Sequence, residues 1–168
     1  YTSSGQQEML PLLLILDYFM PKYYKNRASL YDEGITAYIE EPEVHIFPIS
    51  QKEIIELIAL VKNSSADNRQ FILTTHSPYI LTSINNLMYA GNLEKKLITE
   101  KDKEKLYKVV PKEMILDPKV VNAYYMADGK CESIIDPEDH LIDAGVIDEV
   151  SENIAIQFDQ LLDIEFDK

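Results

Sequence analysis

The chain has 168 residues, a length that suits one ordinary domain with a sizeable core. Hydrophobic residues make up 46% and charged residues 27%, the range of globular proteins, and no segment is of low complexity. The net charge of −13 argues against direct contact between this chain and a nucleic-acid backbone. The longest apolar run, residues 11–16, is too short to span a bilayer. The single Cys131 gives neither a disulfide nor metal-ligand spacing, which favours a reducing, cytoplasmic setting.

The chain is predicted to open with a helix and then a short strand. The helix begins near Ser4, and Pro11 and Pro21 are expected to kink or divide it. Residues 35–39 are apolar and predict a short buried strand that ends in an acidic run. A second helix, capped by Ser50, follows this strand.

A similar alternation continues to about residue 90. Residues 70–74 predict a second buried strand, followed by a short helix through Ile80 and Ile84. Residues 87–90 are interpreted as a third strand. This order of strands and helices predicts an α/β fold with a parallel-sheet core and crossover helices.

The second half of the chain is predicted to form a smaller β-hairpin and helix appendage. The Asp128-Gly129 pair is typical of a tight hairpin turn. The expected elements are a charged loop, two strands, the hairpin turn, a return strand and a last helix, at residues 95–105, 106–110, 120–126, 127–130, 131–135 and from 147. We therefore divide the chain by its motifs into residues 1–92 and a C-terminal α+β extension, residues 93–168.

Two adjacent glutamates, Glu40 and Glu41, follow the first predicted strand. The carboxyl ends of parallel strands are where such sheets bind ligands. Because neighbouring strand residues point to opposite faces, one carboxylate could meet hydrated magnesium while the other approaches a water nucleophile. An acidic, solvated turn is the alternative explanation of the same residues.

Two further segments carry groups suited to phosphate. His76 follows the second predicted strand, and its imidazole could donate a hydrogen bond to a phosphate oxygen. The segment Ser3-Ser4-Gly5-Gln6 stands at a helix start, where free backbone N–H groups favour an anion. The alternatives are an incidental histidine in a helix-capping loop and simple N-capping by Ser4.

Taken in order, these segments resemble the motifs of the ATP-binding-cassette ATPases, in the branch of the RecF, SMC and OLD-type proteins. The matching segments are similar to the signature, Walker B with its catalytic glutamate, the D-loop region and the switch-histidine motif, at residues 2–6, 39–43, 45–48 and 74–78. The resemblance covers roughly the first half of the chain. It implies the C-terminal half of a P-loop NTPase core, with ATP and Mg²⁺ as cofactors.

The resemblance also implies a role for each matching residue. Glu40 would orient magnesium, Glu41 would polarise the attacking water, and His76 would contact the γ-phosphate. The signature segment would close over ATP bound by a second subunit, so a homodimer of the complete protein is implied; its residues are Ser3, Ser4, Gly5 and Gln6. Phosphoryl transfer suits this division because the protein mainly positions groups and stabilises charge.

The sequence departs from the family pattern at three motif positions and in one missing motif. Glu40 stands where aspartate is usual, Ser4 replaces a glycine and Thr2 replaces a leucine. No G-x-x-x-x-G-K-[ST] loop occurs, so the sequence contains no cradle for the phosphates. We expect that loop upstream in the natural protein, and we expect the isolated chain to be inactive.

Two other classes of function remain open on the residues alone. A carboxylate metal-dependent hydrolase could use residues from the two strand ends, namely Glu40, Glu41, Glu43, His45 and His76. A non-catalytic interaction module could instead use the hairpin and the final acidic helix as a docking surface. The metal-dependent hydrolase needs no missing segment, but it leaves Ser3-Ser4-Gly5-Gln6 unexplained.

Overall fold

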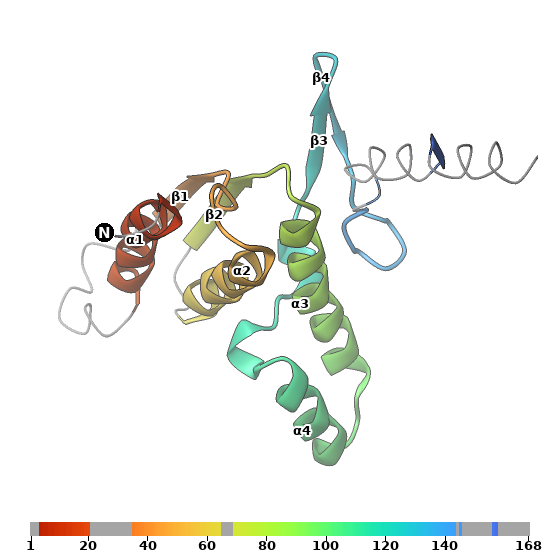
Figure 1. Ribbon diagram of the computed structural model, residues 1–168. Helices are drawn as coiled ribbons and strands as arrows, with labels where there is room; N and C mark the ends of the chain where they lie inside the picture. The colour runs from red at the N-terminus through yellow and green to blue at the C-terminus, as the bar shows by residue number, and fades with distance from the viewer. Residues whose placement is uncertain (1–3, 21–34, 65–68, 144, 146–155, 158–168) are drawn as a thin grey trace, which may run out of the picture. The chain divides into compact units, whose positions relative to one another are not determined.

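The computed structural model describes residues 4–20, 35–64, 69–143, 145 and 156–157. Two compact units divide between Val121 and Asn122. The first contains α1 (Ser4–Tyr18), β1 (Ile35–Glu40), α2 (Pro48–Asn63), β2 (Arg69–Thr74), α3 (Pro78–Lys96), α4 (Glu100–Val109) and the 3₁₀ turns η2 (Lys112–Met114) and η3 (Pro118–Val120) (Figure 1). The second contains β3 (Tyr124–Ala127) and β4 (Lys130–Ser133). Within the described ranges, no helix combines the length and apolar character needed to cross a membrane.

The two strands predicted at residues 35–39 and 70–74 are confirmed as β1 and β2. They pair in parallel, with Ile35 opposite Arg69 and Glu40 opposite Thr74. Helix α2 connects them, as a crossover between parallel strands requires. The architecture is mixed α/β and compatible with part of a P-loop NTPase-like fold.

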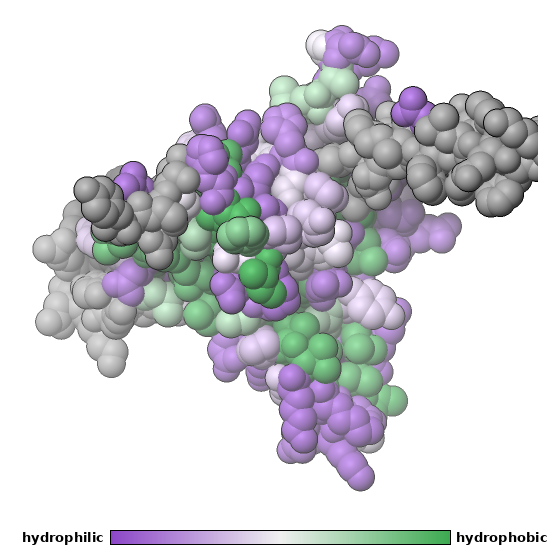
Figure 2. All heavy atoms as spheres, in the orientation of Figure 1, coloured by the Kyte–Doolittle hydropathy of each residue, from purple (hydrophilic) through white to green (hydrophobic). Residues whose placement is uncertain are grey.

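The strand pair is covered on one face by the helices. Alternate residues Ile39, Phe71 and Leu73 pack against a core that α1, α2 and α3 supply; its buried members are Leu16, Ile54, Ile55, Ile58, Ala59, Val61, Ile80 and Leu87. Burying one such side chain contributes about 1.5–3 kcal/mol. The opposite face is exposed and carries Thr36, Tyr38, Glu40, Gln70, Ile72 and Thr74. Figure 2 shows apolar surface reaching solvent among hydrophilic regions on the face that it presents.

The predicted third strand at residues 87–90 is wrong, because these residues belong to the long helix α3. Buried residues recur along α3 at helical spacing, among them Ile80, Leu87 and Gly91. The Ser77 hydroxyl accepts a hydrogen bond from the Tyr79 amide and caps the helix, and Pro78 occupies its first turn. Helix α3 crosses residue 92, and the two compact units divide between residues 121 and 122. The motif-based division at residues 92 and 93 stays a prediction.

The charged stretch after α3 is also helical, contrary to the predicted loop at 95–105 and strand at 106–110. Thr99 caps α4 by accepting from the Asp102 amide, and Leu106 is its buried residue. Favourable charge placement supports this short helix, with Glu100 and Asp102 in its first turn and Lys108 in its last. A local charge pattern at helical spacing therefore outweighed the low hydrophobicity of the segment.

The helix starts also differ in detail from expectation. Helix α2 begins at Pro48 with Phe47 as its N-cap residue, so Ser50 lies inside the helix and does not cap it. Helix α1 runs from Ser4 to Tyr18 without being divided at Pro11. Pro21 lies outside the described residues.

The second unit contains the predicted hairpin. Strands β3 and β4 pair antiparallel, and the two residues between them, Asp128 and Gly129, have φ angles of 51° and 74°. Two successive positive φ values match the tight turn that Asp-Gly favours. Only residues 124–126 of the predicted strand 120–126 belong to β3. The predicted start of the last helix at Ile147 lies outside the described residues.

Candidate functional site

The carboxyl ends of β1 and β2 lie side by side and bring the two strongest sequence motifs together. Glu40 is opposite Thr74 in the strand register. The Glu41 amide continues the ladder by donating to the Thr74 carbonyl at 2.9 Å. A pocket of about 410 Å³ opens beside these ends, between α1 and β1, and its lining residues are Met9, Leu12, Ile39, Glu40, Glu41, Pro42 and Val44.

Glu41 and His76 face each other across these two strand ends. Their closest atoms, Glu41 Oε1 and His76 Nε2, are 3.6 Å apart, which is beyond an ordinary hydrogen bond. The side chains are 47% and 88% exposed, so both can reach a bound molecule. The predicted catalytic residues therefore share one site, while the adjacent Glu40 lies on the exposed face of β1.

The loop after β1 has an unusual backbone. Glu41 and His45 have positive φ angles of 41° and 57°, a conformation that non-glycine residues adopt at a cost of about 1–3 kcal/mol each. Buried Pro42 and the Glu41–Thr74 backbone bond hold the loop in this form. The left-handed turn at Glu41 sets the direction in which the chain leaves the sheet.

Glu43 ties this loop to the loop after β2. Its Oε1 accepts hydrogen bonds from the Thr75 hydroxyl at 2.8 Å and from the His76 amide at 2.7 Å. The other oxygen, Oε2, is buried and has no hydrogen-bond partner among the described residues. Sequence reasoning considered Glu43 only as a metal ligand and did not foresee this link.

A second, buried link lies behind the site. The Ser77 hydroxyl donates to Gln51 Oε1 at 2.6 Å, and Gln51 Nε2 donates to the Ile46 carbonyl at 3.3 Å. Ser77 and Gln51 are both buried, so these polar groups are satisfied by each other. Gln51 was not predicted from the sequence. The only indication of its role is that a polar residue stands on the buried face of α2.

The signature-like segment packs against the same loop of its own chain. Gly5 is buried, and a Cβ atom there would lie 2.4 Å from the His45 carbonyl oxygen. Only glycine permits this approach. Ser4 and Gln6 belong to the first turn of α1, and Ser3 lies outside the described residues. The structure therefore joins Gly5 to the β1–α2 loop, and the expected contact of these residues with nucleotide remains a prediction.

The acidic residues at the end of β1 suit a hydrated magnesium ion better than a protein-enclosed metal. Magnesium takes one or two carboxylates and keeps several waters, which fits the exposed Glu40 and Glu41. No group of three or more His, Cys, Asp or Glu side chains within the described residues is arranged to hold a metal. Glu43 Oε1 is already engaged by two donors, so it is not free as a ligand.

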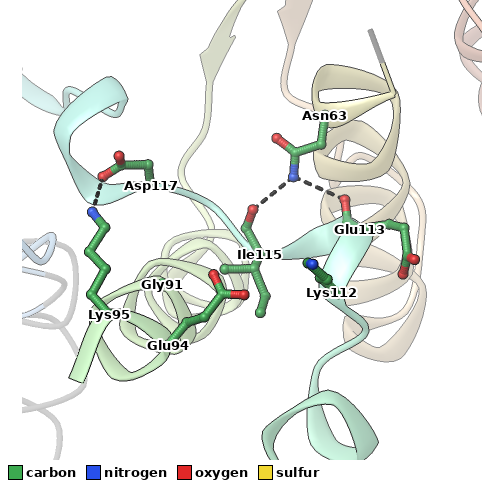
Figure 3. A pocket seen from close by; sticks show the side chains of 8 residues that line it. All are labelled: Asn63, Gly91, Glu94, Lys95, Lys112, Glu113, Ile115 and Asp117. Atoms are coloured by element: carbon green, nitrogen blue, oxygen red, sulfur yellow. Dashed lines mark hydrogen bonds and ion pairs between the residues drawn. The ribbon is translucent and has the colours of Figure 1, made fainter. Parts of the chain in front are cut away.

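A larger pocket of about 560 Å³ lies away from these residues, between α2, α3 and η2. Figure 3 shows that its polar groups largely pair with one another: Asn63 Nδ2 donates to the carbonyls of Glu113 and Ile115, and Lys95 forms an ion pair with Asp117. Glu94 accepts from the Tyr107 hydroxyl. The groups that line this pocket thus fasten residues 110–120 to the helices.

A parallel strand pair with acidic and imidazole groups at its carboxyl ends is typical of α/β proteins that bind ligands at that edge. Residues 1–81 match the family model described as AAA ATPase domain, and this match supports an AAA-type ATPase domain in the chain. The matched range contains β1, β2 and every candidate site residue. No curated protein and no solved structure matches the chain.

Proposed function

We propose that this chain supplies the sheet edge at which an ATPase hydrolyses ATP. The observation that carries the proposal is the meeting of Glu41 and His76 at 3.6 Å, at the adjacent ends of β1 and β2. A carboxylate beside a developing nucleophile and an imidazole near the phosphate are the groups that phosphoryl transfer to water needs. The AAA ATPase domain match over residues 1–81 supports nucleotide binding and ATPase activity as the general function.

In this proposal each residue has a distinct task. Glu41 accepts a proton from, or orients, the attacking water. His76 donates a hydrogen bond to the γ-phosphate, and Glu40 holds the water shell of magnesium. Magnesium, when bound with ATP, neutralises the negative charge that develops on the phosphates.

We further propose that the phosphate-binding loop is contributed by a segment upstream of this sequence. The exposed face of the strand pair supports this idea, because parallel sheets are normally covered on both faces. On that face Tyr38 is 75% exposed, a large aromatic surface to leave in water. The finer assignment to an ATP-binding-cassette type of the RecF, SMC and OLD branch rests on the motif order.

The same assignment carries a proposal about assembly. The signature segment of one protomer would contact ATP bound by its partner, making the complete protein a homodimer closed by nucleotide. The support is the order of the motifs and the position of Gly5, which links the signature segment to the loop that carries Glu41.

Calorimetric titration with Mg²⁺ and ATP tests the proposal on two proteins. The 168-residue chain alone should bind ATP no tighter than millimolar, because it has no phosphate cradle. The same chain joined to its upstream phosphate-binding loop should bind and hydrolyse ATP. Micromolar binding by the chain alone would contradict the division of labour, and no hydrolysis by the joined protein would contradict the function.

A metal-dependent hydrolase is the other function that the sequence left open. Across the described residues no suitable cluster of three ligands exists, and Glu43 is engaged in holding the neighbouring loop. No specific observation therefore favours this second function.

A further inference from the structure

We propose that Glu43 is the positioning residue that fixes His76 at the site, an inference that rests on the proposed ATPase function. Glu43 lies in the loop after β1, whereas His76 follows β2. One carboxylate oxygen of Glu43 nevertheless accepts from the His76 amide at 2.7 Å and from the Thr75 hydroxyl at 2.8 Å. Glu43 touches no reacting atom in this arrangement, so it acts through the backbone of His76.

The geometry explains why this link controls the direction of the imidazole. The side chain of His76 is 88% exposed and gains little orientation from packing. Its backbone is the part that the fold can hold, and hydrogen bonds to a charged acceptor are about twice as strong as those between neutral groups. The Ser77 amide also donates to the Thr75 hydroxyl, at 3.0 Å, so the carboxylate organises the turn that leads into α3.

The loop that carries Glu43 is itself held firmly. The positive φ angles at Glu41 and His45 flank Glu43, and the His45 carbonyl is in close contact with Gly5 of α1. A rigid loop can transmit a fixed position to His76, whereas a loop without these contacts could not. Glu41 and His76 are therefore set relative to each other through the segment that separates Glu41 from α2.

The unpartnered oxygen of Glu43 provides a sharp test. Only Oε1 receives hydrogen bonds, while Oε2 is buried with no partner among the described residues. In Glu43→Gln the amide oxygen can take the place of Oε1, and the amide nitrogen replaces an atom that makes no bond. The glutamine variant thus keeps both links and loses the charge, whereas Glu43→Ala loses both links.

The experiment compares these two variants in the protein that carries this chain with its phosphate-binding loop. In Glu43→Ala the kcat for ATP should fall about tenfold or more, as the loss of bonds to a charged acceptor predicts, with the dissociation constant for ATP unchanged. Glu43→Gln should lose only about threefold, less than Glu43→Ala, since both acceptor contacts remain although the charge that strengthens them is lost. The matched control is Glu53→Ala at an exposed glutamate of α2, which should leave kcat unchanged. Equal kcat in Glu43→Ala and wild type, or equal losses in the alanine and glutamine variants, would overturn the inference.

A second readout separates this inference from the proposed function. The His76 amide should exchange with solvent about tenfold faster in Glu43→Ala than in wild type, because its acceptor is lost, and this measurement needs no ATP. A wild-type protein without hydrolysis contradicts the function alone, and unchanged exchange contradicts the positioning role alone. If Glu43→Ala does not fold, Thr75→Val removes one of the two donors, and a wild-type kcat in that variant would count against the inference.

Discussion

The imidazole Nε2 of His76 lies 3.6 Å from Oε1 of Glu41, although the two residues follow different strands. The parallel register of β1 and β2 causes this meeting, since Glu40 stands opposite Thr74 and each candidate residue comes within two positions of the end of its strand. The two side chains face one space without being bonded to each other. In the proposed function, a water molecule and a phosphate oxygen would therefore each meet a separate group there.

Glu41→Gln should abolish ATP turnover in the protein joined to its phosphate-binding loop, while ATP binding persists. An amide keeps the size of the side chain but cannot act as a base, and general-base catalysis typically contributes about 10²–10⁴-fold. Single-turnover hydrolysis and calorimetric ATP binding measure the two effects. Glu53→Gln on α2 is the control. Near-normal turnover in Glu41→Gln would move the catalytic role to another residue.

Gly5→Ala should destabilise the chain by about 1–3 kcal/mol, because the new methyl group would overlap a backbone carbonyl. The Cβ would stand 2.4 Å from the His45 oxygen. Without that contact, replacing glycine by alanine in a helix would stabilise the helix by about 0.5–1 kcal/mol. The sign of the change in the free energy of unfolding therefore shows whether the contact exists. Thermal unfolding measures it, with Thr82→Ala at an exposed site of α3 as control. A higher melting temperature in Gly5→Ala would show that α1 does not rest on this loop.

The strands of the site were predictable because each is a short apolar run bounded by polar groups. Once β1 and β2 are placed in a parallel sheet, the neighbourhood of Glu41 and His76 follows from the geometry of strand ends. The strand prediction at Leu87–Ala90 was wrong because four consecutive apolar residues show no periodicity that separates a strand from a helix. Its helical nature appears only when it is read together with Ile80, with which it shares the buried side of α3.

The links within the site could not be read from the sequence. Glu43 reaches Thr75 and His76 because the backbone turns through left-handed conformations at Glu41 and His45, which nothing in their residue types requires. Positive φ is uncommon for any residue other than glycine, although histidine adopts it more readily than glutamate does. Tertiary contacts, including the close approach of Gly5 to the His45 carbonyl, impose that geometry. The local residue propensities do not predict it.

Asn63→Ala should loosen the segment that follows α4. Asn63 Nδ2 donates to the Glu113 carbonyl at 2.9 Å and to the Ile115 carbonyl at 2.7 Å. Loss of both bonds should cost about 1–2 kcal/mol in the free energy of unfolding. Asn63→Asp should cost more, because a carboxylate would face two carbonyl acceptors. Chemical denaturation tests this, with exposed Asn86→Ala as control; equal stability of the alanine and aspartate variants would contradict the assigned direction of the bonds.

The Tyr107 hydroxyl should ionise at a higher pH than the hydroxyl of an ordinary tyrosine. Its hydrogen bond to Glu94, then burial, then the negative charge of Glu94 raise the pKa of Tyr107 to about 12. Because the folded pKa lies above the unfolded value of about 10, this group contributes stability below pH 10. That contribution is lost as the pH rises from about 10 to about 12.

Glu94→Gln should lower the Tyr107 pKa below about 12 without returning it fully to its ordinary value, since the charge that opposes ionisation is lost but the amide oxygen still accepts the hydroxyl. The near-ultraviolet absorbance of tyrosinate follows the titration. Comparison with Tyr107→Phe isolates the contribution of Tyr107 to the absorbance of the 11 tyrosines. The difference between wild type and Tyr107→Phe should titrate near pH 12. In the Glu94→Gln background the same difference should titrate at lower pH. An identical midpoint in both backgrounds would show that the charge of Glu94 does not hold the Tyr107 proton.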